Sequence, residues 1–167
     1  MRGDKKAMSR RQSVCRKMTW LLVVGIMIMI YSLSHQPATQ SRQLSNHFIE
    51  AFKQVIQVAP VLSTSTKATL LSEAGFYIRK LAHMWIYALL GSIILAALWQ
   101  TSIRKEKCFI LALGLSTLYA LIDEWHQFYV AGRSAELRDV LIDSMGALAG
   151  ILVTWFMIFC TKKFLKG

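Results

Sequence analysis

The amino-acid sequence predicts an all-α integral membrane protein, a bundle of four transmembrane helices with an extracytoplasmic amphipathic helix. The first observation is composition: 54% of the 167 residues are hydrophobic and the mean hydropathy is +0.41, whereas soluble domains are about 45–50% apolar. The second is that the excess is concentrated in four blocks, each near the roughly 20 residues that a spanning helix needs. The third is that lysines and arginines flank these blocks, as topology signals do.

The apolar blocks divide the chain into one transmembrane domain and two short basic ends. Residues 1–17 form a basic cytoplasmic N-terminus, residues 18–160 the transmembrane domain and residues 161–167 a basic cytoplasmic tail. A chain of this length has no room for a separate catalytic module beside four spans. The spans are expected at about 18–34, 80–99, 108–125 and 140–160.

The first apolar block is the shortest of the four. Its continuous apolar run, Met18 to Leu33, is about 16 residues long and crosses a bilayer only with help from neighbouring residues and local thinning. A cleaved signal peptide is the alternative, because a basic start, an apolar core and the small-x-small triplet Ser32-Leu33-Ser34 fit that pattern too. Retention of the segment gives an even number of spans, and we interpret it as a membrane helix.

A polar connection separates the first two spans and contains the expected amphipathic helix. Apolar residues recur there at helical spacing, with polar residues on the opposite side. The helix either lies on the outer membrane surface or packs as an ordinary helix against the bundle. The apolar positions are Phe48, Phe52, Val55, Ile56 and Ala59, and the polar ones are Asn46, Glu50, Lys53 and Gln57.

The charge distribution predicts the orientation of the bundle. Of the 20 basic residues, 13 lie in the two ends of the chain and in the connection between the second and third spans, which places all three in the cytoplasm. Nothing aromatic is interleaved with these charges as a base-stacking surface requires, so we expect no nucleic-acid partner. Cys15, Cys108 and Cys160 have no ligand-like spacing and argue against a disulfide framework and a zinc site.

The fourth span carries a pair of small residues at helical spacing. Gly146 and Gly150 are four residues apart, so a neighbouring helix backbone can approach closely at this face. The neighbour is either another helix of the same bundle or a second copy of the chain in a homodimer.

Nearly all the unusual polar residues fall at the outward ends of the second, third and fourth spans. Lys80 and His83, like Asp123 and His126, are three residues apart and can share a helix face. Ionisable groups inside a membrane are functional candidates by default, whereas Arg79, Glu136 and Arg138 fit a solvated rim or a structural ion-pair network. The predicted ligand-binding residues are Lys80, His83, Asp123, Glu124, His126, Gln127, Arg133, Asp139 and Asp143.

Three chemistries are open to this cluster. Lys80 and Arg133 complement a phosphate or carboxylate ligand. Acid–base catalysis is the second, with His83, Asp123, Glu124 and His126 as candidates. A metal is the third, because imidazole and carboxylate ligands suit zinc or manganese; with no HExxH run or comparable motif, we assign neither a metal nor another cofactor. The set considered for a metal is His83, Asp123, His126 and Asp143.

The order and spacing of several short motifs resemble the VanZ-like family. The resemblance implies a multi-pass protein of the bacterial cell membrane, and the founding member of the family is associated with low-level resistance to teicoplanin, a lipoglycopeptide that acts on lipid-linked cell-wall precursors. The motifs are Ser34-His35-Gln36-Pro37, Lys80-Leu81-Ala82-His83, Ile122-Asp123-Glu124-Trp125-His126-Gln127, Gly132-Arg133-Ser134, Asp139-Val140-Leu141-Ile142-Asp143 and Gly146-Ala147 through Gly150.

The sequence departs from the family pattern at two places. The family usually has asparagine where this chain has Asp143, so a neutral hydrogen-bonding role at that position does not carry over directly. The connection from Pro37 to Phe76 is also long for the family, so its helix is expected to be peculiar to this chain.

Three functions remain open from the sequence. The first, which we favour, is a non-enzymatic binding or accessory role toward an anionic envelope lipid, a lipid-linked cell-wall precursor or a lipoglycopeptide. The second is a membrane-embedded hydrolase or transferase acting on a lipid-phosphate or envelope polymer, with His126 or Glu124 as the acid or base. The third is a structural scaffold whose polar cluster only holds the bundle together.

Overall fold

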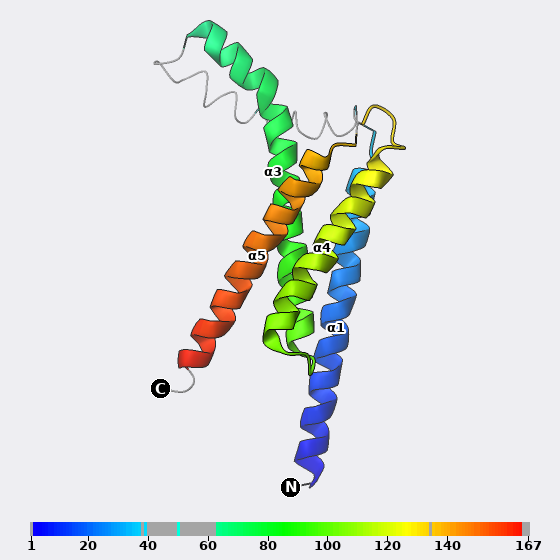
Figure 1. Cartoon of the computed structure of the whole chain (residues 1–167), viewed down its shortest axis with the longest axis vertical. Coiled ribbons are helices and arrows are strands. Elements are labelled where there is room, and N and C mark those ends of the chain that lie inside the picture. The colour runs from blue at the N-terminus through cyan, green and yellow to red at the C-terminus, as the bar shows by residue number, and fades with distance from the viewer. Residues whose placement is uncertain (1, 38, 40–49, 51–62, 134, 165–167) are drawn as a thin grey trace.

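The computed structural model describes residues 2–37, 39, 50, 63–133 and 135–164. The regular secondary structure of these residues is all helical (Figure 1). Four of the helices are long and apolar enough to cross a membrane, and the shortest crossing segment has 23 residues, or about 35 Å at 1.5 Å per residue. The predicted four-helix membrane fold is confirmed. The helices are α1 (Arg2–Ser34), α3 (Thr64–Trp99), α4 (Lys105–Gln127) and α5 (Leu137–Phe164).

Several helices extend beyond the apolar spans. Helix α1 includes the basic N-terminus and ends at Ser34, because Pro37 lacks an amide donor and restricts the residue before it. Helix α3 begins at Thr64, well before the expected start of the span at Lys80, because helix formation needs no apolar side chains and the segment contains no proline. The membrane-crossing parts are Arg11–Ser34, Glu73–Trp99, Lys105–Gln127 and Leu137–Thr161.

The amphipathic helix expected around Phe48 to Ala59 falls on residues outside those that the structure describes, apart from the helical residue Glu50. That part of the fold stays a prediction.

The most extensive helix contact is between α3 and α5. Glycines make it close: a Cβ at Gly146 would meet the Met84 carbonyl, and a Cβ at Gly150 would meet the Ala88 carbonyl. Gly91 of α3 lies in turn against the backbone of Ala147. The two glycines of α5 thus serve packing within the chain, as small residues do in membrane bundles, and a homodimer through them stays a prediction.

The bundle has a narrow core and a broad apolar exterior. Tyr87, Leu90 and Ile151 are fully buried in its interior, together with Ile30 of α1. Helix α1 packs on α3 and α4, and the Tyr119 hydroxyl of α4 donates a hydrogen bond to the Met27 carbonyl of α1. The large side chains outside the core are mostly apolar and exposed, which is the arrangement that a lipid environment stabilises.

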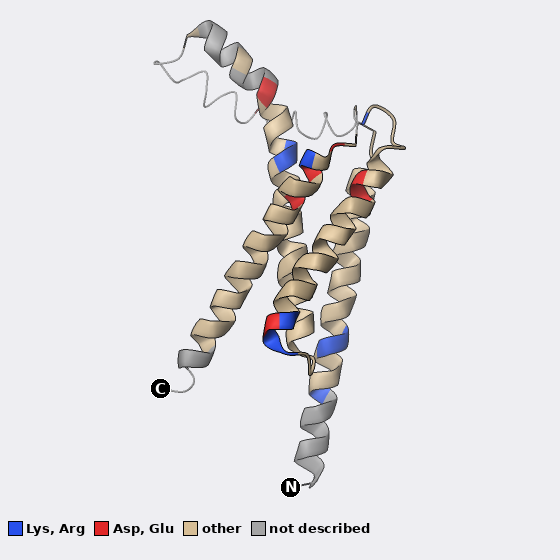
Figure 2. Cartoon of the chain, in the orientation of Figure 1, with Lys and Arg blue, Asp and Glu red and all other residues tan. Residues whose placement is uncertain are grey.

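The two ends of the bundle differ in their chain connections. Both termini and the short α3–α4 connection lie at one end (Figures 1 and 2). There the Lys105 ammonium donates to the Trp99 carbonyl at the end of α3 and lies over the Trp99 ring, and a cation is favoured at a helix C-terminus. The opposite end contains the end of α1, the α4–α5 connection and the polar residues of the candidate site.

Candidate functional site

Acidic and basic residues of α3, α4 and α5 gather at the end of the bundle opposite the termini (Figure 2). Asp123 lies four residues before the end of α4 at Gln127, or about 6 Å along the axis, and Asp143 lies six residues after Leu137, or about 9 Å. These carboxylates therefore sit one to two turns inside the ends of their helices, deeper than a solvated rim.

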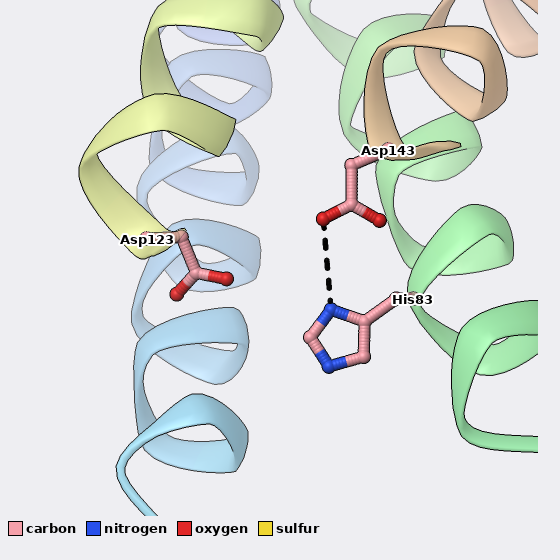
Figure 3. Close-up of side chains that lie close together, drawn as sticks. All are labelled: His83, Asp123 and Asp143. Carbon is pink, nitrogen blue, oxygen red and sulfur yellow. Dashed lines mark ion pairs between the residues drawn. The ribbon is translucent and has the colours of Figure 1, made fainter. Parts of the chain in front are cut away.

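Three ionisable side chains meet in the interior of this end, and we call them the inner cluster: His83 of α3, Asp123 of α4 and Asp143 of α5 (Figure 3). One donor atom from each residue lies within 4.8 Å of the other two. His83 Nδ1 is 3.7 Å from an oxygen of Asp143, an ion-pair distance that is long for a direct hydrogen bond. The helical spacing predicted that these groups would converge, and the structure brings them together.

The two carboxylates of the inner cluster are removed from water, with Asp123 and Asp143 each only 3% exposed. An ionised carboxylate at such depth is costly unless a counter-charge or several hydrogen bonds offset the lost hydration. His83 is the basic group that the two carboxylates share.

Hydrogen bonds fix one oxygen of Asp123 and leave the other without a partner. The Ser34 hydroxyl at the end of α1 donates to Oδ2 at 2.9 Å, and the Gln127 amide donates to the same oxygen at 3.2 Å. Oδ1 is buried and has no hydrogen-bond partner among the described residues. Ser34 belongs to a motif that the sequence analysis identified but did not include in the site; only the contact across 89 residues reveals its role.

Tyr87 is a second residue that sequence reasoning missed. It lies one turn from His83 on α3 and is fully buried, with its hydroxyl beside the Asp123 carboxylate and without a hydrogen bond of normal geometry among the described residues. In the sequence it is one apolar-flanked tyrosine of a span, so no local signal distinguishes it from a core residue.

Arg133, in the α4–α5 connection, ties three parts of the chain together. Its guanidinium donates to the Gln127 side-chain oxygen at 3.0 Å, to the Gln36 carbonyl at 3.1 Å and to the Leu33 carbonyl at 3.3 Å. Burial lowers the pKa of Arg133, and the negative charge of Asp123 opposes this effect. The guanidinium stays protonated at neutral pH because its ordinary pKa lies above 12. The turn that presents Arg133 uses Gly132 at φ 76°, a backbone conformation that favours glycine.

An outer layer of polar contacts covers the inner cluster. Lys80 of α3 forms an ion pair with Asp139 of α5. Glu124 accepts a hydrogen bond from the Glu136 backbone amide at 2.7 Å and so anchors the chain just before α5 begins. The first contact joins two helices and the second fixes the connection that leads into α5, so these predicted site residues have at least a positional role.

His126 does not join the inner cluster, although it was considered with it. Its Nε2 lies 3.2 Å from His35 Nδ1, and its ring packs against those of His35 and Tyr31 at the end of α1. Glu124 and His126, the two acid–base candidates of the hydrolase hypothesis, thus engage different partners.

Comparison with known proteins agrees with the motifs and the fold. A family model described as VanZ/LLP1 matches residues 19–159, a range that includes every residue of the inner cluster and of the outer layer. The comparisons with curated proteins and with solved structures found no match. Motif order, the four-helix fold and the family match agree, and the chain belongs to the VanZ/LLP1 family.

Proposed function

We propose that this protein binds the anionic headgroup of an envelope lipid, a lipid-linked cell-wall precursor or a lipoglycopeptide, without catalysing a reaction. Family membership supports a membrane protein of the cell envelope. The binding end is the one opposite the start of α1 and the end of α5. It faces outward in this proposal, since 13 of the 20 basic residues fall within residues 1–17, 100–107 and 161–167, and basic residues beside spans stay in the cytoplasm.

The observation that carries this proposal is the bonding of the Arg133 guanidinium. Among the described residues its three hydrogen-bond acceptors, the Gln127 amide oxygen and the carbonyls of Gln36 and Leu33, are all neutral. Asp123 and Glu124 attract it without a direct ion pair, so the guanidinium can bind an incoming anion. The bond to Leu33 is long and exposed, so a phosphate or carboxylate oxygen, which forms a stronger charge-assisted bond, can replace it.

Lys80 supplies a second positive charge. It pairs with Asp139 in a contact whose side chains are 21% and 17% exposed. An ion pair that water reaches contributes little stability, on the order of 1 kcal/mol or less. An anionic headgroup can therefore compete with Asp139 for the ammonium.

Exposed aromatic side chains shortly before Arg133 in the sequence suit an amphipathic ligand. Trp125, Phe128 and Tyr129 are 67%, 64% and 71% exposed and lie at the last turn of α4 and just after it. Tryptophan and tyrosine prefer the boundary between headgroups and acyl chains. A ligand whose anionic group meets Arg133 can rest its acyl part on these side chains.

The direct test measures lipid retention by native mass spectrometry on the full chain in detergent, with phosphatidylglycerol compared with phosphatidylcholine. The variant is Lys80→Gln with Arg133→Gln, which removes both charges and keeps a donor at each position. Each cation near an anionic surface contributes about 1 kcal/mol, so the double variant should bind phosphatidylglycerol about 30-fold more weakly.

The matched control is Arg104→Gln with Lys107→Gln, which removes two exposed charges at the opposite end of the bundle. We expect it to change phosphatidylglycerol binding by less than about threefold, since these charges are far from the site. Equal effects of the two double variants would contradict a site at Arg133 and leave only general attraction of anionic lipid to a basic protein.

A resistance assay distinguishes the lipoglycopeptide from the other ligands. A susceptible Gram-positive host producing the intact chain should tolerate more teicoplanin and no more vancomycin, because only teicoplanin has the acyl tail. The Lys80→Gln, Arg133→Gln variant, at equal membrane abundance, should lose this difference. A host with no change toward either drug, together with normal lipid binding, would assign the site to an envelope lipid.

A further inference from the structure

We propose that His83, Asp123 and Asp143 form a binding site for one divalent transition-metal ion, zinc or manganese, in the inner cluster. The sequence left a metal unassigned because no local motif marks one. The structure supplies the missing observation: the three candidate ligands come from three helices and meet only in the folded bundle (Figure 3). This inference does not depend on headgroup binding.

The distances within the inner cluster suit a shared ion. The donor atoms lie within 4.8 Å of one another, whereas a tetrahedral ion with bonds of about 2.1 Å places its ligands about 3.4 Å apart. His83 and Asp143, at 3.7 Å, already stand close to that separation. Asp123 needs a shift of at most about 1.4 Å to reach that separation, which a side-chain rotation supplies.

Asp123 has the bonding pattern of a positioned metal ligand. Ser34 and Gln127 hold its Oδ2, and Arg133 holds Gln127 in turn. Such outer contacts orient the carboxylate ligands of metal sites. The remaining oxygen, Oδ1, is buried and makes no hydrogen bond of normal geometry among the described residues, although the Tyr87 hydroxyl lies beside the carboxylate. Figure 3 shows one oxygen of Asp123 directed toward His83 and Asp143. A buried polar atom rarely stays unpaired, and an ion between the three residues would give the carboxylate a strong partner.

The charge of the inner cluster also favours a cation. Metal ligation uses the ionised carboxylates and the neutral imidazole, a form with a net charge of about −2 that is costly to bury in a membrane protein without a cation. Two cations at this end have other partners: Lys80 pairs with Asp139, and Arg133 donates to neutral oxygens. A divalent ion would neutralise the cluster, and the 24% exposure of the His83 side chain provides its route of entry.

The donor types restrict the identity of the ion. One imidazole nitrogen with two carboxylates suits zinc and manganese, whereas calcium and magnesium prefer all-oxygen sites and copper(I) prefers sulfur. Three protein ligands leave at least one position for water or an oxygen of a bound ligand. His126 stays outside this set because it pairs with His35.

Asp143 is the carboxylate of the inner cluster that lies at ion-pair distance from His83. A neutral amide is a much poorer metal ligand than a carboxylate. Asp143→Asn therefore removes one charged ligand with almost no change in volume. It is the most informative single variant.

The experiment uses the full chain without a histidine tag, purified in detergent, stripped with a chelator and then titrated with Zn²⁺ and Mn²⁺. We expect about one tightly bound ion per chain by elemental analysis after gel filtration. Co²⁺, a spectroscopic substitute for zinc, should give the visible absorption bands of a site with few ligands. Loss of one outer-shell contact lowers metal affinity about 10–100-fold, so Asp143→Asn and Asp123→Asn should each lower it at least about 100-fold.

Two variants serve as matched controls. Asp139→Asn removes a carboxylate one turn from Asp143 that pairs with Lys80, and His126→Gln removes a histidine one turn from Asp123 that pairs with His35. Both should keep wild-type affinity for the metal. Helical circular dichroism and a single gel-filtration peak identify the folded variants.

A folded wild-type protein that retains no Zn²⁺ or Mn²⁺ and gives no Co²⁺ bands overturns the metal site, whatever the variants do. Equal affinity in Asp143→Asn and Asp139→Asn overturns it too, because it means that the ion binds elsewhere. The lipid measurements on Lys80 and Arg133 are made with chelator present, so the two proposals fail or stand separately.

Discussion

Replacing Gly150 by alanine tests whether close backbone approach holds α3 and α5 together. A Cβ at this position would face the Ala88 carbonyl, 2.6 Å from its carbon atom, and would lie 2.7 Å from the Ser92 hydroxyl oxygen. Ordinary contact begins near 3.4 Å. The two backbones must therefore separate by at least about 0.8 Å, and by more to clear the Ala88 oxygen itself; at such a gap dispersion contacts lose at least a quarter to a half of their strength.

The magnitude follows from two opposing effects. Overpacking of this kind costs about 1–3 kcal/mol, and the better helix propensity of alanine returns at most about 1 kcal/mol. Gly150→Ala should lower the free energy of unfolding by up to about 2 kcal/mol. Gly114 of α4 is the matched control, because a Cβ there meets nothing within 4 Å and Gly114→Ala should leave stability unchanged or raise it by up to about 1 kcal/mol.

Titration of the folded protein with sodium dodecyl sulfate in mixed micelles, followed by far-ultraviolet circular dichroism, measures both variants. Gly150→Ala should unfold at a lower detergent fraction than the wild type. If it unfolds at the same or a higher fraction than Gly114→Ala, the close approach of α5 to α3 contributes nothing to stability and the reasoning is refuted.

Two further predictions concern the end of α1 and the orientation of the bundle. Ser34→Ala removes the hydroxyl that donates to Asp123 and should lower the free energy of unfolding by about 1.5–3 kcal/mol in the same titration; an unchanged midpoint would show that Gln127 alone satisfies that oxygen. In a Cys15→Ser background, a membrane-impermeant thiol reagent should label Ala131→Cys on intact cells and Ser102→Cys only after permeabilisation, and the reverse pattern would invert the proposed orientation.

The sequence predicts the fold well because a membrane-spanning helix must meet two physical requirements, sufficient length and an apolar surface. Each of the four apolar blocks meets both. The start of α3 at Thr64 was missed because hydropathy marks only the part of a helix that crosses. Polar turns that continue a helix beyond the membrane give no apolar signal.

The candidate site is only partly readable from the sequence. Helical spacing places His83, Asp123 and Asp143 at one end of the bundle and on inward faces, and these residues do meet. Spacing does not predict which side of α4 packs against α1. The packing of α1 on α4 places His126 beside His35 and Ser34 beside Asp123. Both contacts depend on side chains about 90 residues apart.

The sequence predicts that Lys80 and Arg133 bind one ligand together, but it does not show the partners that each cation has in the fold. Each cation already has partners in the fold: an aspartate for Lys80 and three neutral oxygens for Arg133. Charge counting identifies cations near a membrane boundary but not the acceptors that tertiary structure brings to them. Because its acceptors are neutral, we propose Arg133 rather than Lys80 as the main binding residue for an anion.

The bonds from Arg133 to Gln36 and Leu33 have a consequence for biosynthesis. They join parts of the chain that are 97 and 100 residues apart. The sequence of α1 is therefore synthesised well before Arg133, the residue that binds its end. At about 5–20 residues per second, roughly 5–20 seconds separate the synthesis of Leu33 from that of Arg133. Insertion and final docking of α1 are therefore separate events, as two-stage folding of membrane helices requires, and the α4–α5 connection completes the assembly.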